Sequence, residues 1–290
     1  MFYQTLISTD ELKQNLGDED WVIVDCRFSL DDTGLGRREY LKAHIPGAVY
    51  AHLDQDLSGR VIPGKTGRHP LPQVGRFIKT LERWGIGQGV QVVTYDDSGG
   101  SIAARLWWLL HWLGHDAVAV LDGGWQRWLK DDGPVKGGNE TPAEGEARQP
   151  RRTLTPHLRQ EMLVSGEEVE AMRLDPAYLL LDARSADRYR GENENRDPVA
   201  GHIPGAISAP YANNLTPDGS FISKEQLQAS FKSLLGDIPA ERAIFYCGSG
   251  VTAAHDVLAL EHAGLGNARL YAGSWSEWIT DPEHPVETGE

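Results

Sequence analysis

Residues 244–258 read IFYCGSGVTAAHDVL: a short apolar run, then a cysteine in a glycine-rich turn, then a second apolar segment. The first run is typical of a buried strand and the last of a helix, so Cys247 stands where a strand leads into a helix. Backbone N–H groups and the helix dipole favour negative charge at such a junction, which lowers the pKa of a thiol and populates the thiolate. Taken alone, the segment leaves two interpretations open, a reactive Cys247 or an inert buried cysteine.

Four motifs occur twice in the chain, in the same order. The pairs are VIVDCR at 22–27 with LLLDAR at 179–184, AHIPGA at 43–48 with GHIPGA at 201–206, VVTYD at 92–96 with AIFYC at 243–247, and LDGGWQRW at 121–128 with LYAGSWSEW at 270–278. Ordered matches over so long a period indicate a duplicated domain and not a solenoid of short repeats.

Each copy alternates short apolar runs with helix-like segments. Strands are predicted at 21–25, 90–95 and 117–121 and again at 178–182, 243–247 and 268–271, and helices at 9–16, 72–84 and 101–113 and again at 165–174, 223–235 and 251–263. This alternation is typical of an α/β fold, in which a parallel β-sheet carries helices on both faces. We therefore predict two such domains, at 1–135 and 156–290, joined by a surface linker at 136–155 that is rich in Pro, Gly, Glu and Arg.

The composition narrows the range of partners. The chain has 290 residues, two cysteines and a formal net charge of −14 at pH 7. The acidic balance argues against nucleic-acid binding, and an anionic substrate would need a locally positive pocket. We recognise no signal peptide and no membrane span, so we expect a cytoplasmic protein without membrane partners. We also expect a monomer. Cys26 and Cys247 form no C-x-x-C pair and no cluster with zinc spacing, so we expect no metal and no other cofactor.

The four motif pairs together resemble the rhodanese family of sulfurtransferases in its tandem two-domain form, over nearly the whole chain. The resemblance implies two rhodanese-like domains, with the catalytic cysteine, Cys247, in the C-terminal one. It implies an inactive N-terminal domain, because Asp96 stands where Cys247 stands in the second copy and a carboxylate cannot carry a transferable sulfur. The loop 247–252 resembles that of members using 3-mercaptopyruvate, since it lacks the basic residues typical of members that prefer thiosulfate.

The implied reaction moves a sulfane sulfur from 3-mercaptopyruvate, or alternatively from thiosulfate, through a persulfide on Cys247. The expected acceptor is a thiol, a thioredoxin-like protein or cyanide. Backbone N–H groups of Gly248, Gly250, Val251 and Thr252 are expected to hold the anionic sulfur, as an oxyanion hole holds an oxyanion. The Thr252 hydroxyl has two open roles, a further donor to the sulfur or the cap of the following helix.

The resemblance carries over further site residues. Ser249 and Asp54 are expected to handle the proton that pyruvate enolate needs as it leaves. Arg188 and Arg196 match arginines that hold the carboxylate and carbonyl of the donor, which suits bidentate pairing, although their spacing is one residue shorter than in mercaptopyruvate enzymes. His69 resembles a histidine near the mouth of the family's active site, and its contact with substrate is left open.

Residues that both copies share indicate folding rather than catalysis. Arg184 recurs as Arg27, so an ion pair is the favoured interpretation of both. His44 recurs as His202 in the same way.

Other functions remain to be weighed against sulfur transfer. A cysteine phosphatase needs an arginine six residues after the cysteine, where this chain has Ala253. A regulatory or binding module would be marked by loss of the cysteine, and Cys247 is present. A persulfide carrier that delivers sulfur to a protein partner stays open.

Overall fold

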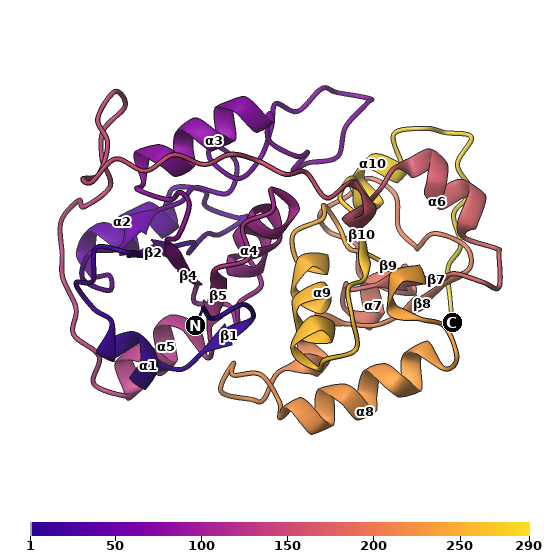
Figure 1. Cartoon of the computed structure of the whole chain (residues 1–290). Helices are drawn as coiled ribbons and strands as arrows, with labels where there is room; N and C mark the ends of the chain where they lie inside the picture. Colours follow the sequence, from indigo (N-terminus) through magenta and orange to yellow (C-terminus); the bar gives the residue numbers. More distant parts are fainter. Residues whose placement is uncertain (1) are drawn as a thin grey trace. The chain divides into compact units, whose positions relative to one another are not determined.

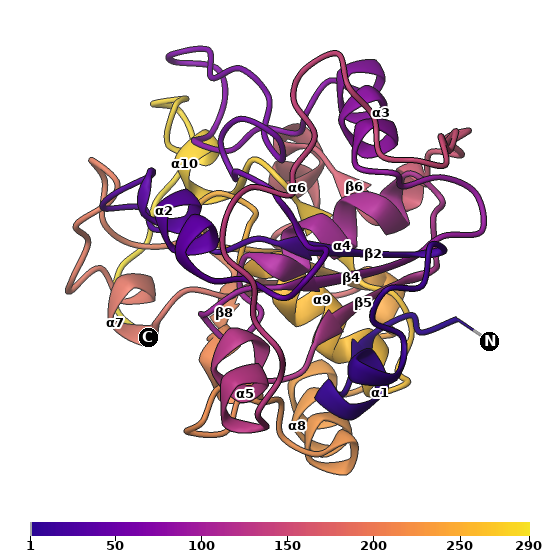
Figure 2. The ribbon, with the colours of Figure 1, turned by 90° about the vertical axis from the view of Figure 1, so that its left-hand side faces the viewer.

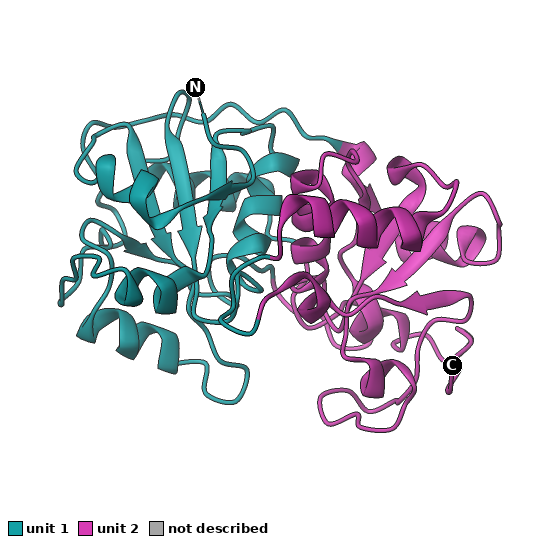
Figure 3. Ribbon diagram, turned by 90° about the horizontal axis from the view of Figure 1, so that it is seen from below, with its two compact units in different colours: residues 1–59, 71–159, 217–221 teal, residues 60–70, 160–216, 222–290 magenta. Residues whose placement is uncertain are grey.

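The computed structural model describes residues 2–290, which divide into two compact units (Figure 3). Unit 1 contains the described residues up to 59, with 71–159 and 217–221, and unit 2 contains 60–70, 160–216 and 222–290. Each unit holds one five-stranded sheet. The segment 60–70 thus lies in the N-terminal half of the chain but belongs to unit 2, and the segment 217–221 lies in the C-terminal half but belongs to unit 1.

The sheet of unit 1 is parallel throughout, in the order β1-β5-β4-β2-β3. Its strands are β1 (Leu6–Ile7), β2 (Trp21–Asp25), β3 (Val49–Tyr50), β4 (Gln91–Tyr95) and β5 (Val118–Leu121). Its helices are α1 (Thr9–Gln14), α2 (Leu35–Lys42), α3 (Val74–Arg83), α4 (Ala103–Trp112) and α5 (Gly124–Lys130).

Helices cover both faces of this sheet. On one face, Val93 and Tyr95 of β4 pack in a buried cluster with Trp128 of α5. On the other face, the Thr94 hydroxyl donates to the Ala103 carbonyl of α4 (3.2 Å). Successive strand residues point to opposite faces, so β4 is buried on both sides. Figure 2 shows α1 and α5 on one side of β2, β4 and β5, and α3 on the other.

The sheet of unit 2 repeats this topology, in the order β6-β10-β9-β7-β8. Its strands are β6 (Leu163–Val164), β7 (Leu179–Asp182), β8 (Ala206–Ser208), β9 (Ala243–Tyr246) and β10 (Arg269–Tyr271). Its helices are α6 (Gly166–Met172), α7 (Ala186–Tyr189), α8 (Lys224–Leu235), α9 (Ala253–His262) and α10 (Ser274–Trp278), with three short 3₁₀ helices at Gln160–Met162, Tyr211–Asn214 and Ala240–Arg242.

The central strand of unit 2, β9, is also buried on both faces. Ile244 and Tyr246 pack in a cluster with Trp275 of α10, whereas the Phe245 ring meets Phe231 of α8 edge to face (centroids 6.3 Å apart). Figure 1 shows α6 and α10 on one side of these strands and α8 on the other. A strand that is buried on both faces carries apolar residues at successive positions, as β9 does.

The helix after the first strand of each unit begins at the same local signal. The Ser8 hydroxyl accepts from the Glu11 N–H before α1, and the Glu11 carboxylate accepts from the Ser8 N–H (2.9 Å). Ser165 and Glu168 form the same capping box before α6. Each box satisfies backbone donors that the first helical turn would leave unpaired.

Two parallel sheets with helices on both faces confirm the predicted α/β fold. Each predicted strand and helix is present with its ends within two residues of the expected positions. The short strands β1, β3, β6 and β8 were not predicted, because two or three residues are too few to show an alternation. The helices α2, α5, α7 and α10 were also missed, and α7 and α10, of four and five residues, are too short to show a helical period.

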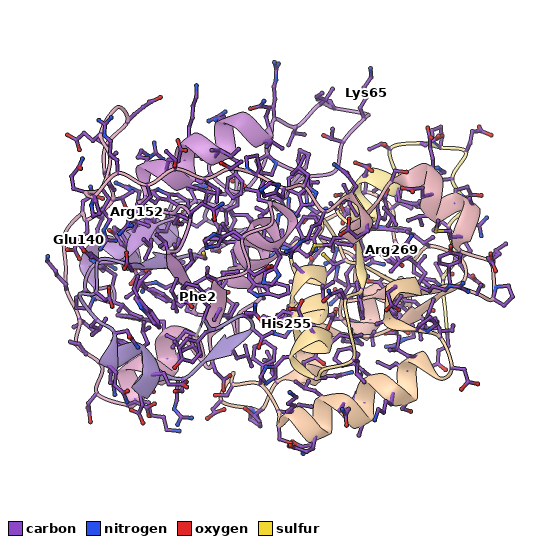
Figure 4. All side chains as sticks on the ribbon, in the orientation of Figure 1. Phe2, Lys65, Glu140, Arg152, His255 and Arg269 are labelled. Carbon is purple, nitrogen blue, oxygen red and sulfur yellow. The ribbon has the colours of Figure 1, made fainter. Side chains whose placement is uncertain are left out.

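The segment 136–155, which the sequence predicts as a surface linker, is part of unit 1. Lys136 and His44 exchange two backbone hydrogen bonds (2.8 and 2.9 Å). The Glu140 carboxylate (Figure 4) accepts from the Gly47 N–H (2.8 Å) and lies 3.0 Å from His44 Nε2. These contacts depend on tertiary structure, so the absence of apolar periodicity in the segment did not reveal them.

Among residues 2–290, no helix is both long enough and apolar enough to cross a membrane.

Candidate active site

Cys247 directly follows β9, and the loop to Thr252 leads into α9. The Cys247 side chain is buried, with 2% of its surface exposed. Its sulfur accepts from the Gly250 N–H (3.2 Å), and its own N–H donates to the Ser274 hydroxyl (3.0 Å). The predicted position of the cysteine, at a strand end facing a helix N-terminus, is therefore the observed one.

The loop holds Cys247 in a state that favours the thiolate. Burial acts to raise the pKa of Cys247, but hydrogen bonds from the Thr252 hydroxyl and from backbone N–H groups of Ser249, Ala253 and Val251 outweigh it, so that the pKa is lowered. A hydrogen bond to the charged form of a group favours that form. Thr252 makes no side-chain cap to α9, so its hydroxyl serves the sulfur and not the helix.

Cys26 has opposite surroundings. It is fully buried next to the end of β2, and both cysteines are free thiols. Burial raises the pKa of the Cys26 thiol, and the nearby carboxylates of Asp25, Asp96 and Asp56 raise it further. A thiol of this kind remains protonated and unreactive near neutral pH.

The turn between β10 and α10 fixes the shape of the loop. The Trp275 N–H donates to the Cys247 carbonyl and the Ser276 N–H donates to the Gly248 carbonyl (3.0 Å each). Gly250 has a φ of +73°, and a Cβ added there would lie 2.2 Å from the Ala272 carbonyl oxygen. Only glycine fits this position, because its backbone is left-handed and pressed against the turn.

Ser249 and His69, 180 positions apart in the sequence, meet in unit 2. The Ser249 hydroxyl and His69 Nδ1 share a hydrogen bond of 2.7 Å. Both side chains are buried, with 6% and 4% of their surfaces exposed. The serine two residues after Cys247 therefore has its hydroxyl hydrogen-bonded to an imidazole.

Two guanidinium groups lie over the loop beside Cys247. A Cβ added at Gly248 would lie 2.8 Å from Arg68 Nη2 and 3.6 Å from both Nη atoms of Arg188. Arg188 pairs with Glu194 (2.9 Å) and Asp197 (3.3 Å), and Arg68 pairs with Asp197. Two guanidinium groups and two carboxylates are therefore gathered beside the catalytic loop.

Sequence reasoning assigned Arg188 to this region but missed Arg68. The available signal was its position directly before His69, in the motif RHPLP at 68–72. Nothing in the pattern of that motif places its first residue at a loop near position 248.

Of the other predicted site residues, Arg196 and Asp54 are exposed and Val251 is buried. The Arg196 side chain is exposed, and its backbone N–H donates to Glu194 Oε1 (2.8 Å). Asp54 lies in unit 1 and is exposed, with its backbone N–H donating to His52 Nδ1 (3.2 Å). Val251 is buried within the loop. The roles predicted for Arg196 and Asp54 stay predictions.

The arginines that recur in both copies form buried ion pairs, as the repetition indicates. Arg184 pairs with Asp182 and Arg27 pairs with Asp25, each at 2.6 Å. Each arginine also donates to the carbonyl before the recurring histidine, at Gly201 and at residue 43 (2.7 Å each). These pairs link the ends of β2 and β7 to the loop before each histidine, which is a structural role.

The recurring histidines have structural contacts as well. The ring of His202 stacks on Tyr189 (3.7 Å between centroids) and the ring of His44 stacks on Tyr40 (4.1 Å). Each Nδ1 lies within hydrogen-bonding distance of the carbonyl of that same tyrosine, at 2.8 Å for His202 and 2.7 Å for His44.

The loop does not suit a cysteine phosphatase. The sixth position after the cysteine is Ala253, the first residue of α9, so the loop lacks the arginine that a phosphatase needs there. Within the described part of the chain, no group of three His, Cys, Asp or Glu residues is arranged to hold a metal ion.

Comparison with known proteins agrees with this geometry. Residues 8–131 and 165–281 each match the rhodanese-like domain. The chain is 46% identical over 287 residues, 98% of each chain, to a protein of Pseudomonas aeruginosa named a probable 3-mercaptopyruvate sulfurtransferase. It is 35% identical to human 3-mercaptopyruvate sulfurtransferase, covering 92% of this chain and 88% of that protein. The crystal structure of SseA from Escherichia coli superposes with a TM-score of 0.78 at 29% identity, covering 95% of this chain and all of that one (100%).

The chain belongs to the rhodanese-like family, with two such domains in tandem, and its enzyme class is that of the sulfurtransferases.

Proposed function

We propose that this sulfurtransferase takes its sulfur from 3-mercaptopyruvate, carries it as a persulfide on Cys247 and delivers it to a thiol or to cyanide. The observation that carries the proposal is the Cys247 sulfur at the start of α9, where the Thr252 hydroxyl and several N–H groups converge and lower its pKa. Donors aimed at a sulfur anion stabilise the thiolate before attack and the persulfide after it. The names of the relatives from Pseudomonas aeruginosa and human support the choice of donor.

The proposed reaction has two steps. The Cys247 thiolate attacks the sulfur of 3-mercaptopyruvate, an S–S bond forms and the C–S bond breaks, with its electron pair left on pyruvate enolate. The enolate takes up one proton and leaves as pyruvate. A thiolate or cyanide then attacks the outer sulfur, the S–S bond breaks, and Cys247 returns as the thiolate.

The proton for the enolate is assigned to the Ser249 hydroxyl. Its hydrogen bond to His69 (2.7 Å) supports this role, because an imidazole can orient the hydroxyl and exchange its proton with the surroundings. Asp54 is proposed as a further member of this proton pathway on the basis of the family resemblance. Arg188 is proposed to hold the carboxylate of the donor, since its guanidinium lies over Gly248.

Thiosulfate is a second candidate donor. The observation that favours it is the pair of guanidinium groups over Gly248, because a compact dianion also gains from such charges. The loop itself is uncharged from Gly248 to Thr252, which favours the larger monoanion 3-mercaptopyruvate.

A reducing compartment suits both free cysteines, so a cytoplasmic location is part of the proposal. A monomeric state, with no metal or cofactor, is also proposed.

The test is a comparison of kcat/KM for the two donors with cyanide as the acceptor. We expect 3-mercaptopyruvate to exceed thiosulfate by at least about tenfold, or roughly 1.4 kcal/mol of transition-state binding. A preference for thiosulfate would overturn the choice of donor and leave only the enzyme class.

A further inference from the structure

Arg68 belongs to a segment that contacts both the loop after Cys247 and the helix α10. Residues 60–70 extend outward at Lys65 (Figure 4) and are part of unit 2. The Arg68 N–H donates to the Ser276 hydroxyl (3.0 Å), and the next residue, His69, bonds to Ser249. A Cβ at Gly67 would lie 2.5 Å from the Gly273 carbonyl oxygen, so the backbone is pressed against the start of α10. The backbone from which the Arg68 side chain extends is therefore held in place.

The guanidinium of Arg68 lies next to that of Arg188. Both groups lie over Gly248, the residue after the nucleophile, and Gly248 leaves room for them because it has no Cβ. Two planar guanidinium forks at one place match the oxygens of a carboxylate and an adjacent carbonyl. The donor of the proposed reaction, an α-keto acid, carries both groups next to the carbon that bears its sulfur.

Asp197 is the internal counter-ion of this pair. Its carboxylate bonds to Arg68 and lies 3.3 Å from Arg188 Nη2, and 3% of its side chain is exposed. A buried carboxylate needs such partners, so it holds the two guanidinium groups at a common position. Burial and the positive charges of Arg188 and Arg184 lower the pKa of Arg68, against the opposing effects of Cys247 and Glu194.

We propose that Arg68 and Arg188 together bind the carboxylate of the sulfur donor. The same two guanidinium groups also bind the Asp197 carboxylate, so the donor shares them with Asp197. The inference rests on the proposed function, since it assumes a carboxylate-bearing donor. It assigns to Arg68 the position that the sequence resemblance gives to Arg196. It also places one donor-binding residue outside the C-terminal copy of the repeat, between β3 and α3 in the sequence.

The test compares Arg68→Gln with the unmodified enzyme, using 3-mercaptopyruvate and cyanide for kinetics and pyruvate as a non-reacting carboxylate for calorimetry. We expect KM to rise about tenfold or more with kcat little changed, and pyruvate binding to weaken by a similar factor. Arg68→Lys, which keeps the charge but loses the fork, should fall between the two. Asp197→Asn should lower KM, because it removes an anion that competes for the same guanidinium groups.

Arg190→Gln is the matched control, since Arg190 pairs with Glu192 at the end of α7, and it should leave KM unchanged. Thermal unfolding of each variant detects a purely structural role. Unchanged KM and unchanged pyruvate binding in Arg68→Gln would overturn the inference, and so would a loss of kcat that follows a lower melting temperature at constant KM. The proposed function fails separately if the unmodified enzyme does not turn over 3-mercaptopyruvate, and pyruvate binding still decides the role of Arg68 in that case.

Discussion

The loops after β4 and β9 share one backbone plan and differ in the anion that they hold. In unit 2, N–H groups and the Thr252 hydroxyl surround the Cys247 sulfur. In unit 1, Asp96 Oδ1 accepts from the N–H groups of Ser98 and Gly100 (2.8 Å each). Its Oδ2 accepts from the N–H groups of Ile102 (2.7 Å) and Ala103 (2.8 Å). Both loops are therefore cradles for an anion at the start of a helix.

The contacts beneath the two loops also correspond. The Trp125 N–H donates to the Asp96 carbonyl (2.8 Å), as the Trp275 N–H donates to the Cys247 carbonyl (3.0 Å). Unit 1 thus has the same cradle and fills it with a carboxylate. The N–H groups of such a loop therefore stabilise either anion, and a transferable sulfur requires the cysteine.

Removing the carboxylate from the loop after β4 should have a large effect on stability. In Asp96→Ala, four N–H groups lose their acceptor, those of Gly100 and Ala103 buried and those of Ser98 and Ile102 partly so, and we expect unit 1 to lose about 3 kcal/mol of unfolding free energy. Urea unfolding measures the loss, and hydrogen exchange at residues 98–103 locates it. Asp97→Ala, at the neighbouring exposed position, should change stability by less than about 0.5 kcal/mol. Equal effects of the two substitutions would contradict the cradle in unit 1.

The serines of the two loops should differ in their effect on turnover. Ser249→Ala is expected to lower kcat with 3-mercaptopyruvate by about tenfold or more, because the enolate loses its proton donor, and Asp54→Asn should act in the same direction. Thiosulfate turnover should fall less, since sulfite leaves without that proton. Ser98→Ala, the counterpart in the loop after β4, should leave both rates unchanged. An unaltered kcat in Ser249→Ala would remove the proton role from this residue, and the same result in Asp54→Asn would remove it from Asp54.

The Thr252 hydroxyl should have a smaller effect, visible in the pH dependence of the thiol. Hydrogen bonds lower the pKa of Cys247, so its thiolate persists above that lowered pKa and is lost as the pH falls through it. Without the hydroxyl, Thr252→Ala should move the midpoint of alkylation by iodoacetamide toward higher pH and slow the reaction about threefold at neutral pH. Thr252→Ser keeps the hydroxyl and should behave like the unmodified protein. A midpoint that does not move in Thr252→Ala would mean that the N–H groups alone set the pKa.

The sequence predicts the parts of the site that are local or repeated. The position of Cys247 follows from the order of a buried strand, a glycine turn and a helix, and the pairing of Arg184 follows from its recurrence as Arg27. The contacts of Arg68 and His69 could not be predicted in this way. They join residues 180 and 208 positions apart, and the sequence carries no period and no second copy that would indicate the packing of segment 60–70 on α10.

The central claim, that Cys247 alone carries the sulfur, is tested most directly by intact-mass measurement after addition of 3-mercaptopyruvate, with peptide mapping of the modified residue. We predict the mass of one added sulfur atom on the unmodified protein and on Cys26→Ser, located at Cys247, and none on Cys247→Ser, because the pKa is lowered at Cys247 and raised at Cys26. Added sulfur on Cys247→Ser, or none on Cys26→Ser, would contradict the account.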